Sequence, residues 1–107
     1  MQAGRELDAL VAEKVMGWTA IKGDLGSMPD GRIYVEVPYY STAIAAAWGV
    51  VEKCKYEVWI RCLHGSCEVR VVDCGHEITR VDADTAPLAI CLAALKAVGY
   101  ELPQEAA

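Results

Sequence analysis

The sequence predicts an α/β (α+β) sandwich, in which a mixed four-stranded sheet packs between three helices. The strongest observation is that every residue from Ala86 to Leu95 is apolar, which is typical of a short buried helix and too short to cross a membrane. Residues 5–17 and 43–53 also carry apolar side chains at helical spacing. Four further segments alternate between apolar and polar residues, as half-buried strands do: 32–37, 56–62, 67–73 and 76–82.

Length and composition indicate a single small domain over residues 1–107. The chain is 54% hydrophobic and has a mean hydropathy of +0.21. A monomer of this size leaves apolar surface uncovered, so we expect a homo-oligomer, with a dimer favoured. The net charge is −5 and the lysines and arginines do not cluster, which argues against general nucleic-acid binding.

Two features predict a cytoplasmic protein. Residues Met1–Asp8 contain no apolar segment, so we expect neither a signal peptide nor membrane association. The cysteines number five, an odd count that is not typical of a secreted disulfide framework. At the other end, residues 101–107 show no periodic pattern, and we expect them to be frayed.

The first predicted helix, Arg5–Gly17, is amphipathic. Its apolar side holds Leu7, Leu10, Val11, Val15 and Trp18, and its polar side holds Glu6, Asp8, Ala9 and Glu13. The next segment, Thr19–Gly31, contains three glycines and is expected to be a loop. A loop of this length suggests a functional role.

A strand is predicted over Arg32–Val37, because apolar and polar residues alternate there, and Pro38 ends it. The helix over residues 43–53 follows, with Ser41 or Thr42 as its N-cap. Its buried side is expected to hold Ile44, Ala47, Trp48 and Val51. Strand 32–37, this helix and strand 56–62 together predict a right-handed βαβ crossover with parallel strands.

The strands over residues 56–62, 67–73 and 76–82 are expected to form a meander. In the last strand the alternation places Ile78 in the core and leaves Glu77, Thr79 and Arg80 more exposed. The final helix, residues 86–98, has Asp84 or Thr85 to cap it, Pro87 in its first turn and Gly99 at its end. In the expected topology, helices 43–53 and 86–98 begin at one edge of the sheet, where their N-termini favour an anion.

Three blocks of sequence resemble a known family: Arg5–Trp18, Pro38–Trp48 and Asp84–Leu95. They are similar to small phage proteins with the phage α/β/α-sandwich domain and, more loosely, to the short nin-region X proteins of lambdoid phages. The resemblance implies a phage or prophage origin, an α/β/α sandwich and no established catalytic activity. Ala43 departs from the family, which usually has an acidic residue after Ser-Thr, so any role of that carboxylate does not carry over.

The sequence predicts no metal site, no cofactor and no catalysis. Cys67 and Cys74 lie at opposite ends of one predicted strand, about 23 Å apart, so they cannot share a zinc ion. Cys62, His64 and Cys67 provide three ligands where a structural zinc needs four. Cys62 and Cys67 can form a disulfide on oxidation, which is not expected in a reducing cytoplasm. No cysteine has an evident base or oxyanion hole, and no nucleotide-binding or zinc-protease motif is present.

Aromatic residues and hydroxyls suggest where a ligand could bind. Trp48 is expected in the core, and Trp59 and Tyr34 on a strand face covered by a helix or a second subunit. Trp18 and Tyr39 border loops, where a ring can stack on a base. The candidate ligand-binding residues are Trp18, Tyr39, Tyr40, Ser41, Thr42, Asp84, Thr85 and Ala86. The hydroxyls can equally serve only as helix caps.

Two hypotheses for function follow. The first is a non-catalytic phage protein that sequesters a nucleotide-derived signalling molecule of host antiviral defence. The second is a protein-interaction module that inhibits or adapts a host protein, favoured by the high hydrophobicity and the Thr19–Gly31 segment. The acidic net charge counts against the first hypothesis unless an arginine, a lysine or a second subunit supplies positive charge.

Overall fold

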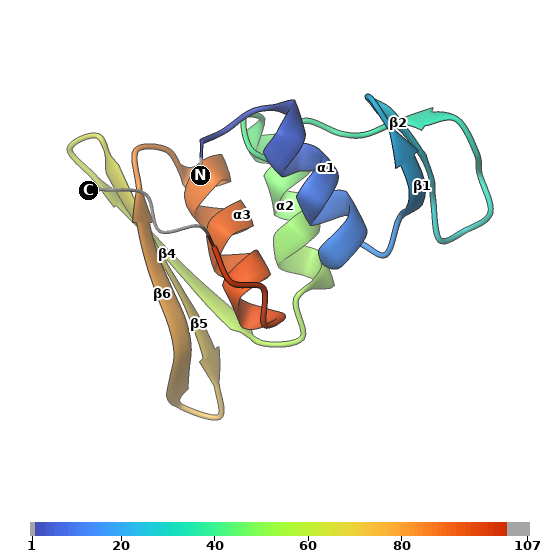
Figure 1. Ribbon diagram of the computed structural model, residues 1–107. Coiled ribbons are helices and arrows are strands. Elements are labelled where there is room, and N and C mark those ends of the chain that lie inside the picture. The colour runs from blue at the N-terminus through green and yellow to red at the C-terminus, as the bar shows by residue number, and fades with distance from the viewer. Residues whose placement is uncertain (1, 103–107) are drawn as a thin grey trace.

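The computed structural model describes residues 2–102. The helices stand side by side, with a small antiparallel sheet on either side of them (Figure 1). The helices are α1 (Arg5–Lys14), α2 (Ile44–Lys53) and α3 (Ala86–Ala97). The expected combination of helices and strands in one fold is therefore confirmed. Of the predicted frayed tail, residues 103–107 lie outside the described part of the chain.

Helix α3 is the most buried element, as its sequence predicts. Eight of its residues, from Pro87 to Leu95, are buried, because α3 packs against α1, α2 and one of the sheets. The Thr85 hydroxyl accepts a hydrogen bond from the Leu88 N–H at 3.4 Å, which confirms one of the two expected caps. Gly99 has a φ of +88° and ends the helix, where the N–H of Tyr100 donates to Leu95 O at 3.0 Å.

The sheet under α3 is the predicted meander of β4 (Glu57–Leu63), β5 (Ser66–Asp73) and β6 (His76–Ala83). Its buried face consists largely of valines, including Val69 and Val71 of β5. Cys62 and Cys67 are direct partners across β4 and β5, and they form a disulfide next to the turn. This disulfide was not expected from the sequence, because a reducing cytoplasm disfavours it.

Ile78 is not a core residue, contrary to the prediction. The pairing of β5 with β6 shifts at a bulge, where Val71 faces Thr79 but Val72 faces Glu77. Thr79 and Val81 pair with the buried Val71 and Val69, so alternation turns Thr79 inward and leaves Ile78, at the bulge, on the outer face. As a result Thr79 is buried, although it was predicted to be exposed, and Ile78 is 42% exposed.

The mixed four-stranded sheet is wrong in detail, since residues 2–102 form two three-stranded antiparallel sheets. Residues 19–37, which we call the hairpin lobe, contain β1 (Thr19–Lys22), β2 (Leu25–Ser27) and β3 (Val35–Glu36). The predicted loop Thr19–Gly31 is therefore largely a hairpin. The strand predicted over residues 32–37 shrinks to β3, which pairs with β2 rather than running parallel to β4. Pairing with a nearby hairpin closes a shorter loop than a crossover does.

Helix α2 presents a different face to the core from the one predicted. Ala47 and Val50 are fully buried, whereas Ile44 and Trp48 are more than half exposed. Neither Ser41 nor Thr42 caps the helix, because the N-cap residue is Ala43, which makes no side-chain hydrogen bond. The apolar side of α2 is therefore wider than the face that the structure buries, which leaves Ile44 and Trp48 in solvent.

Candidate functional site

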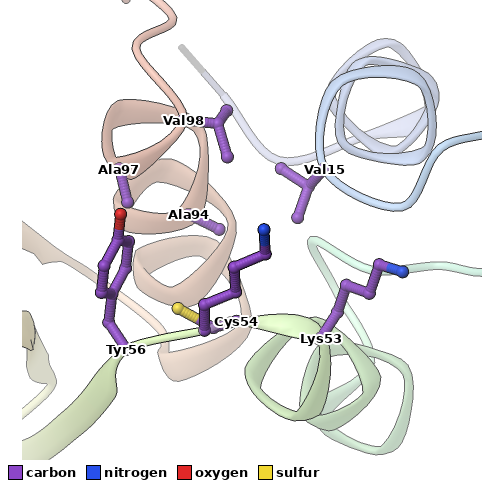
Figure 2. Close-up of a pocket in the computed structure, with 8 residues that line it drawn as sticks. Val15, Lys53, Cys54, Tyr56, Ala94, Ala97 and Val98 are labelled. Carbon is purple, nitrogen blue, oxygen red and sulfur yellow. The ribbon is translucent and has the colours of Figure 1, made fainter.

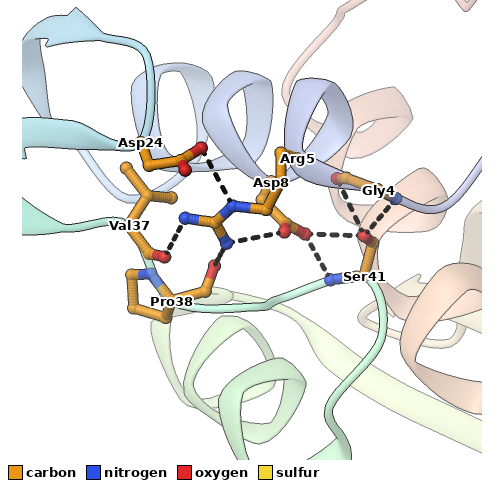
Figure 3. A network of polar contacts seen from close by, with 7 residues as sticks. All are labelled: Gly4, Arg5, Asp8, Asp24, Val37, Pro38 and Ser41. Atoms are coloured by element: carbon orange, nitrogen blue, oxygen red, sulfur yellow. Dashed lines mark hydrogen bonds and ion pairs between the residues drawn. The ribbon is translucent and has the colours of Figure 1, made fainter.

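A buried carboxylate organises the polar contacts between α1 and the segment before α2 (Figure 3). Asp8 is fully buried, although the helical pattern placed it on the polar side of α1. Its Oδ1 accepts hydrogen bonds from the Ser41 N–H at 2.8 Å and the Ser41 hydroxyl at 2.6 Å. Its Oδ2 accepts from Arg5 Nη1 at 3.0 Å. The turn at residues 38–42 covers this side of α1, which is why the exposed face was predicted wrongly.

Arg5 connects this carboxylate to the hairpin lobe. Its Nη2 donates to Val37 O at 2.6 Å, and its Nε donates to Asp24 Oδ1 at 3.2 Å in the β1–β2 turn (Figure 3). Its guanidinium also lies 4.1 Å from the ring centre of Tyr39. Burial lowers the pKa of Arg5, but its hydrogen bonds to Asp24 and Asp8 outweigh burial and raise the pKa above its ordinary value. One permanently charged side chain therefore holds the β1–β2 turn and the last residue of the hairpin lobe against α1.

The predicted ligand site is only partly accessible. Trp18, Tyr40 and Ser41 are buried, and the Ser41 hydroxyl is engaged by Asp8 and by the Gly4 N–H at 2.9 Å. Burial raises the pKa of the Tyr40 hydroxyl. The structure leaves four of the candidates exposed, with Ala86 half-buried beside them: Tyr39, Thr42, Asp84 and Thr85. We call these four residues the helix rim, since α2 and α3 begin at the same end of the helical layer (Figure 1).

The hairpin lobe contains a hollow of about 600 Å³ that was not predicted. Its largest apolar side chains, Leu25, Ile33 and Tyr34, are all exposed, and Tyr34 is 79% exposed. Tyr34 has a φ of +57° and Ala20 a φ of +51°, in the left-handed region that side chains with a Cβ rarely adopt. Such backbone strain clusters at binding sites. The full lining is Ala20, Lys22, Gly23, Leu25, Gly26, Ser27, Ile33 and Tyr34.

A smaller pocket of about 250 Å³ lies at the opposite ends of the helices. Figure 2 shows it between the ends of α2 and α3, with Val15 of α1 across from Val98. Two alanines and two valines line it. Its two charged residues, Lys53 and Lys55, are both basic, and Tyr56 also lines it. Cys54 contributes a thiol.

Metal binding and a nucleophilic Cys91 are two further kinds of chemistry that the described part of the chain does not support. Among residues 2–102, no group of three or more His, Cys, Asp or Glu side chains is arranged to hold a metal ion. Burial raises the pKa of the Cys91 thiol to about 12, so this cysteine is protonated at neutral pH and is no nucleophile. None of the helices in that range is long and apolar enough to span a membrane.

Comparison with known proteins agrees with this fold. Residues 9–95 match the family model of the phage ABA sandwich domain. The crystal structure of a phage protein from Bacillus cereus superposes with a TM-score of 0.78 at 36% sequence identity. That similarity covers 96% of this chain and 93% of the Bacillus cereus chain. No curated protein matches the chain.

The chain is therefore a small phage protein with a mixed α/β fold. It belongs to the phage ABA sandwich domain family, because the family model covers most of its length. The resemblance of the three sequence blocks to this family is confirmed. Nothing in the family assignment provides evidence of catalytic activity.

Proposed function

We propose that this phage protein acts by binding, without catalysis, and that it sequesters a nucleotide-derived signalling molecule of host antiviral defence. The observation that supports the proposal is the hollow in the hairpin lobe. Its volume lies within the range of small-molecule sites. The protein would act in the bacterial cytoplasm, where such signals are made.

The residues that line the hollow are better suited to binding a nucleotide than to catalysing a reaction. The exposed Tyr34 ring offers a face for base stacking, and Lys22 offers a charge for a phosphate. Gly23, whose Cβ position is open, allows a ligand close to the backbone. Ser27 is the one hydroxyl nucleophile besides the tyrosine, and no histidine or carboxylate lines the hollow to activate it.

The helix rim is the alternative location for the same ligand. Helix α2 lacks a side-chain cap, so its first N–H groups are open to an anion. Thr42 and Thr85 provide exposed hydroxyls there, and Tyr39 provides an exposed ring already stacked on Arg5. Asp84 is a repulsive neighbour for a phosphate, which favours the hollow over the helix rim.

A thermal-shift screen against cyclic dinucleotides and ADP-ribose derivatives tests the proposal, because a ligand of the native state raises the melting temperature. Loss of stacking on Tyr34 removes about 1–3 kcal/mol per base, so Tyr34→Ala should weaken binding about tenfold or more. Lys22→Ala should weaken it as well, whereas Lys14→Ala, outside the hollow, is the control. If only Thr42→Gly and Thr85→Gly weaken binding, the ligand occupies the helix rim. A screen without any shift contradicts the proposal.

A second candidate function is a protein-interaction module that inhibits or adapts a host protein. It is favoured by the exposed Ile44 and Trp48 on α2, which lie one helical turn apart and form an uncovered apolar strip. Co-purification of a defined host protein from infected cells should then be lost in Trp48→Ser and kept in Tyr34→Ala. The opposite pattern would favour the ligand hypothesis.

A further inference from the structure

The face of β4–β6 that points away from α3 is uncovered among the described residues. Strand register arranges its side chains in three rows that cross all three strands. The rows are Glu57–Val72–Glu77, then Trp59–Arg70–Arg80, then Arg61–Glu68–Asp82. We call this surface the open face.

An exposed tryptophan lies within this charged surface. Trp59 is 58% exposed, and its indole N–H donates to Glu57 on the same strand. A tryptophan left in solvent forfeits the burial of a large apolar ring. Sheets that keep one face in solvent usually carry polar residues there, so a tryptophan surrounded by arginines and carboxylates is typical of an interface core with a polar rim.

The charges on the open face are complementary to those of a second copy of the same face. The first row is acidic at both ends, and the second row is basic at two positions. Neighbouring rows are two residues apart, about 7 Å. A two-fold axis between these rows places each acidic row over the basic row of the other copy, so that every favourable contact occurs twice.

Existing ion pairs do not compete strongly with this arrangement. Arg70 Nε lies 2.9 Å from Glu68 Oε1 and 3.8 Å from Glu77 Oε1, and Arg80 Nε lies 3.8 Å from Glu68 Oε2. All four side chains remain partly exposed, and surface pairs of this kind contribute little to stability. The arginines can therefore turn toward a partner at little cost.

We propose that the protein forms a homodimer through the open face, with Trp59 of one copy over Glu57 of the other and Glu77 of one copy opposite Arg80 of the other. The hairpin lobe lies on the far side of the helices from β4–β6 (Figure 1). Each dimer therefore carries two hollows that face solvent independently, and the proposal does not depend on what the hollow binds.

Light scattering on the full chain at micromolar concentrations tests this interface. The wild type should have twice the 11.6 kDa mass of one chain. Trp59→Ala should raise the dissociation constant at least about tenfold, because the tryptophan side chain becomes buried in the interface and tryptophans are frequent binding hot spots. Trp48→Ala is the matched control, because Trp48 is 52% exposed on α2 and outside the open face.

Charge reversal gives a test that does not depend on apolar contacts. Glu77→Arg places arginine against arginine at both symmetric contacts, and Arg80→Glu places carboxylate against carboxylate, so each variant alone should be monomeric. A mixture of the two variants should dimerise again, because the mixed pair is complementary at both contacts. Circular dichroism checks that each variant is folded.

Two results would overturn the proposal. One is a wild type that remains at the mass of a single chain over the micromolar range. The other is a dimer that persists in Trp59→Ala and in both charge reversals, which would place the interface on another surface.

Discussion

The contacts of Asp8 predict that Asp8→Ala is one of the most destabilising substitutions of a polar residue in α1. The carboxylate is fully buried and accepts two hydrogen bonds from Ser41 and one from Arg5. Each hydrogen bond to a charged group contributes about 1.5–3 kcal/mol. The Arg5 side chain is 29% exposed, so solvent screens its share and the two bonds to Ser41 dominate.

We therefore expect Asp8→Ala to lower the free energy of unfolding by about 3–5 kcal/mol, the usual cost of removing one partner of a buried pair. That is a large part of the roughly 5–15 kcal/mol that a domain has. Urea denaturation followed by circular dichroism measures the loss. Glu13→Ala, at an exposed acidic position of the same helix, should stay within about 0.5 kcal/mol of the wild type. A loss below about 1 kcal/mol in Asp8→Ala would refute the reasoning.

Three further predictions concern the core and pH. Leu95→Asp should prevent folding, because an unpaired buried carboxylate costs several kcal/mol, whereas Val98→Asp, which is more than half exposed, should fold; circular dichroism distinguishes them. Gly26→Val should cost about 1–3 kcal/mol in urea denaturation, because a Cβ there would lie 3.0 Å from the Trp18 ring. The pKa of Cys91 is raised from about 9 to about 12 in the folded chain. Its stabilising contribution is therefore complete below pH 9 and is lost as the pH rises toward 12, so the stability of Cys91→Ala should fall less steeply with pH over that range.

Elements with a strong local signal could be predicted from the sequence. The apolar run in α3 requires burial on every side, and Thr85, Pro87 and Gly99 mark its ends by local backbone chemistry alone. The meander of β4–β6 follows from alternation and short turns, which need no distant partner. These elements depend on residues that are close together in the sequence, so the sequence alone is enough to predict them.

Errors arose where a distant segment decided the outcome. The pattern of α1 could not reveal that the turn before α2 covers Asp8, and the pattern of α2 could not show that α3 leaves Trp48 in solvent. Ile78 was misplaced because the pairing of Thr79 with the buried Val71 sets which side of β6 faces the core, and a single strand's pattern does not show that pairing. The partner of β3 was also misjudged, because alternation identifies a strand but does not say which strand it pairs with.

The candidate site divides in the same way. The sequence named Tyr39, Thr42 and Thr85 as ligand-binding candidates and the structure leaves them exposed, whereas a functional role for Thr19–Gly31 stays a prediction. The sequence could not distinguish an exposed hydroxyl from the buried one of Ser41, nor foresee that Leu25, Ile33 and Tyr34 would line one hollow. The sequence by itself determined the central helix and the meander, because those depend on local periodicity, and the resemblance of its three blocks indicated the family. Only the tertiary structure decided which face of each element is buried. Burial depends on the element and on the segment that packs against it, and the pattern of one segment does not show its packing partner.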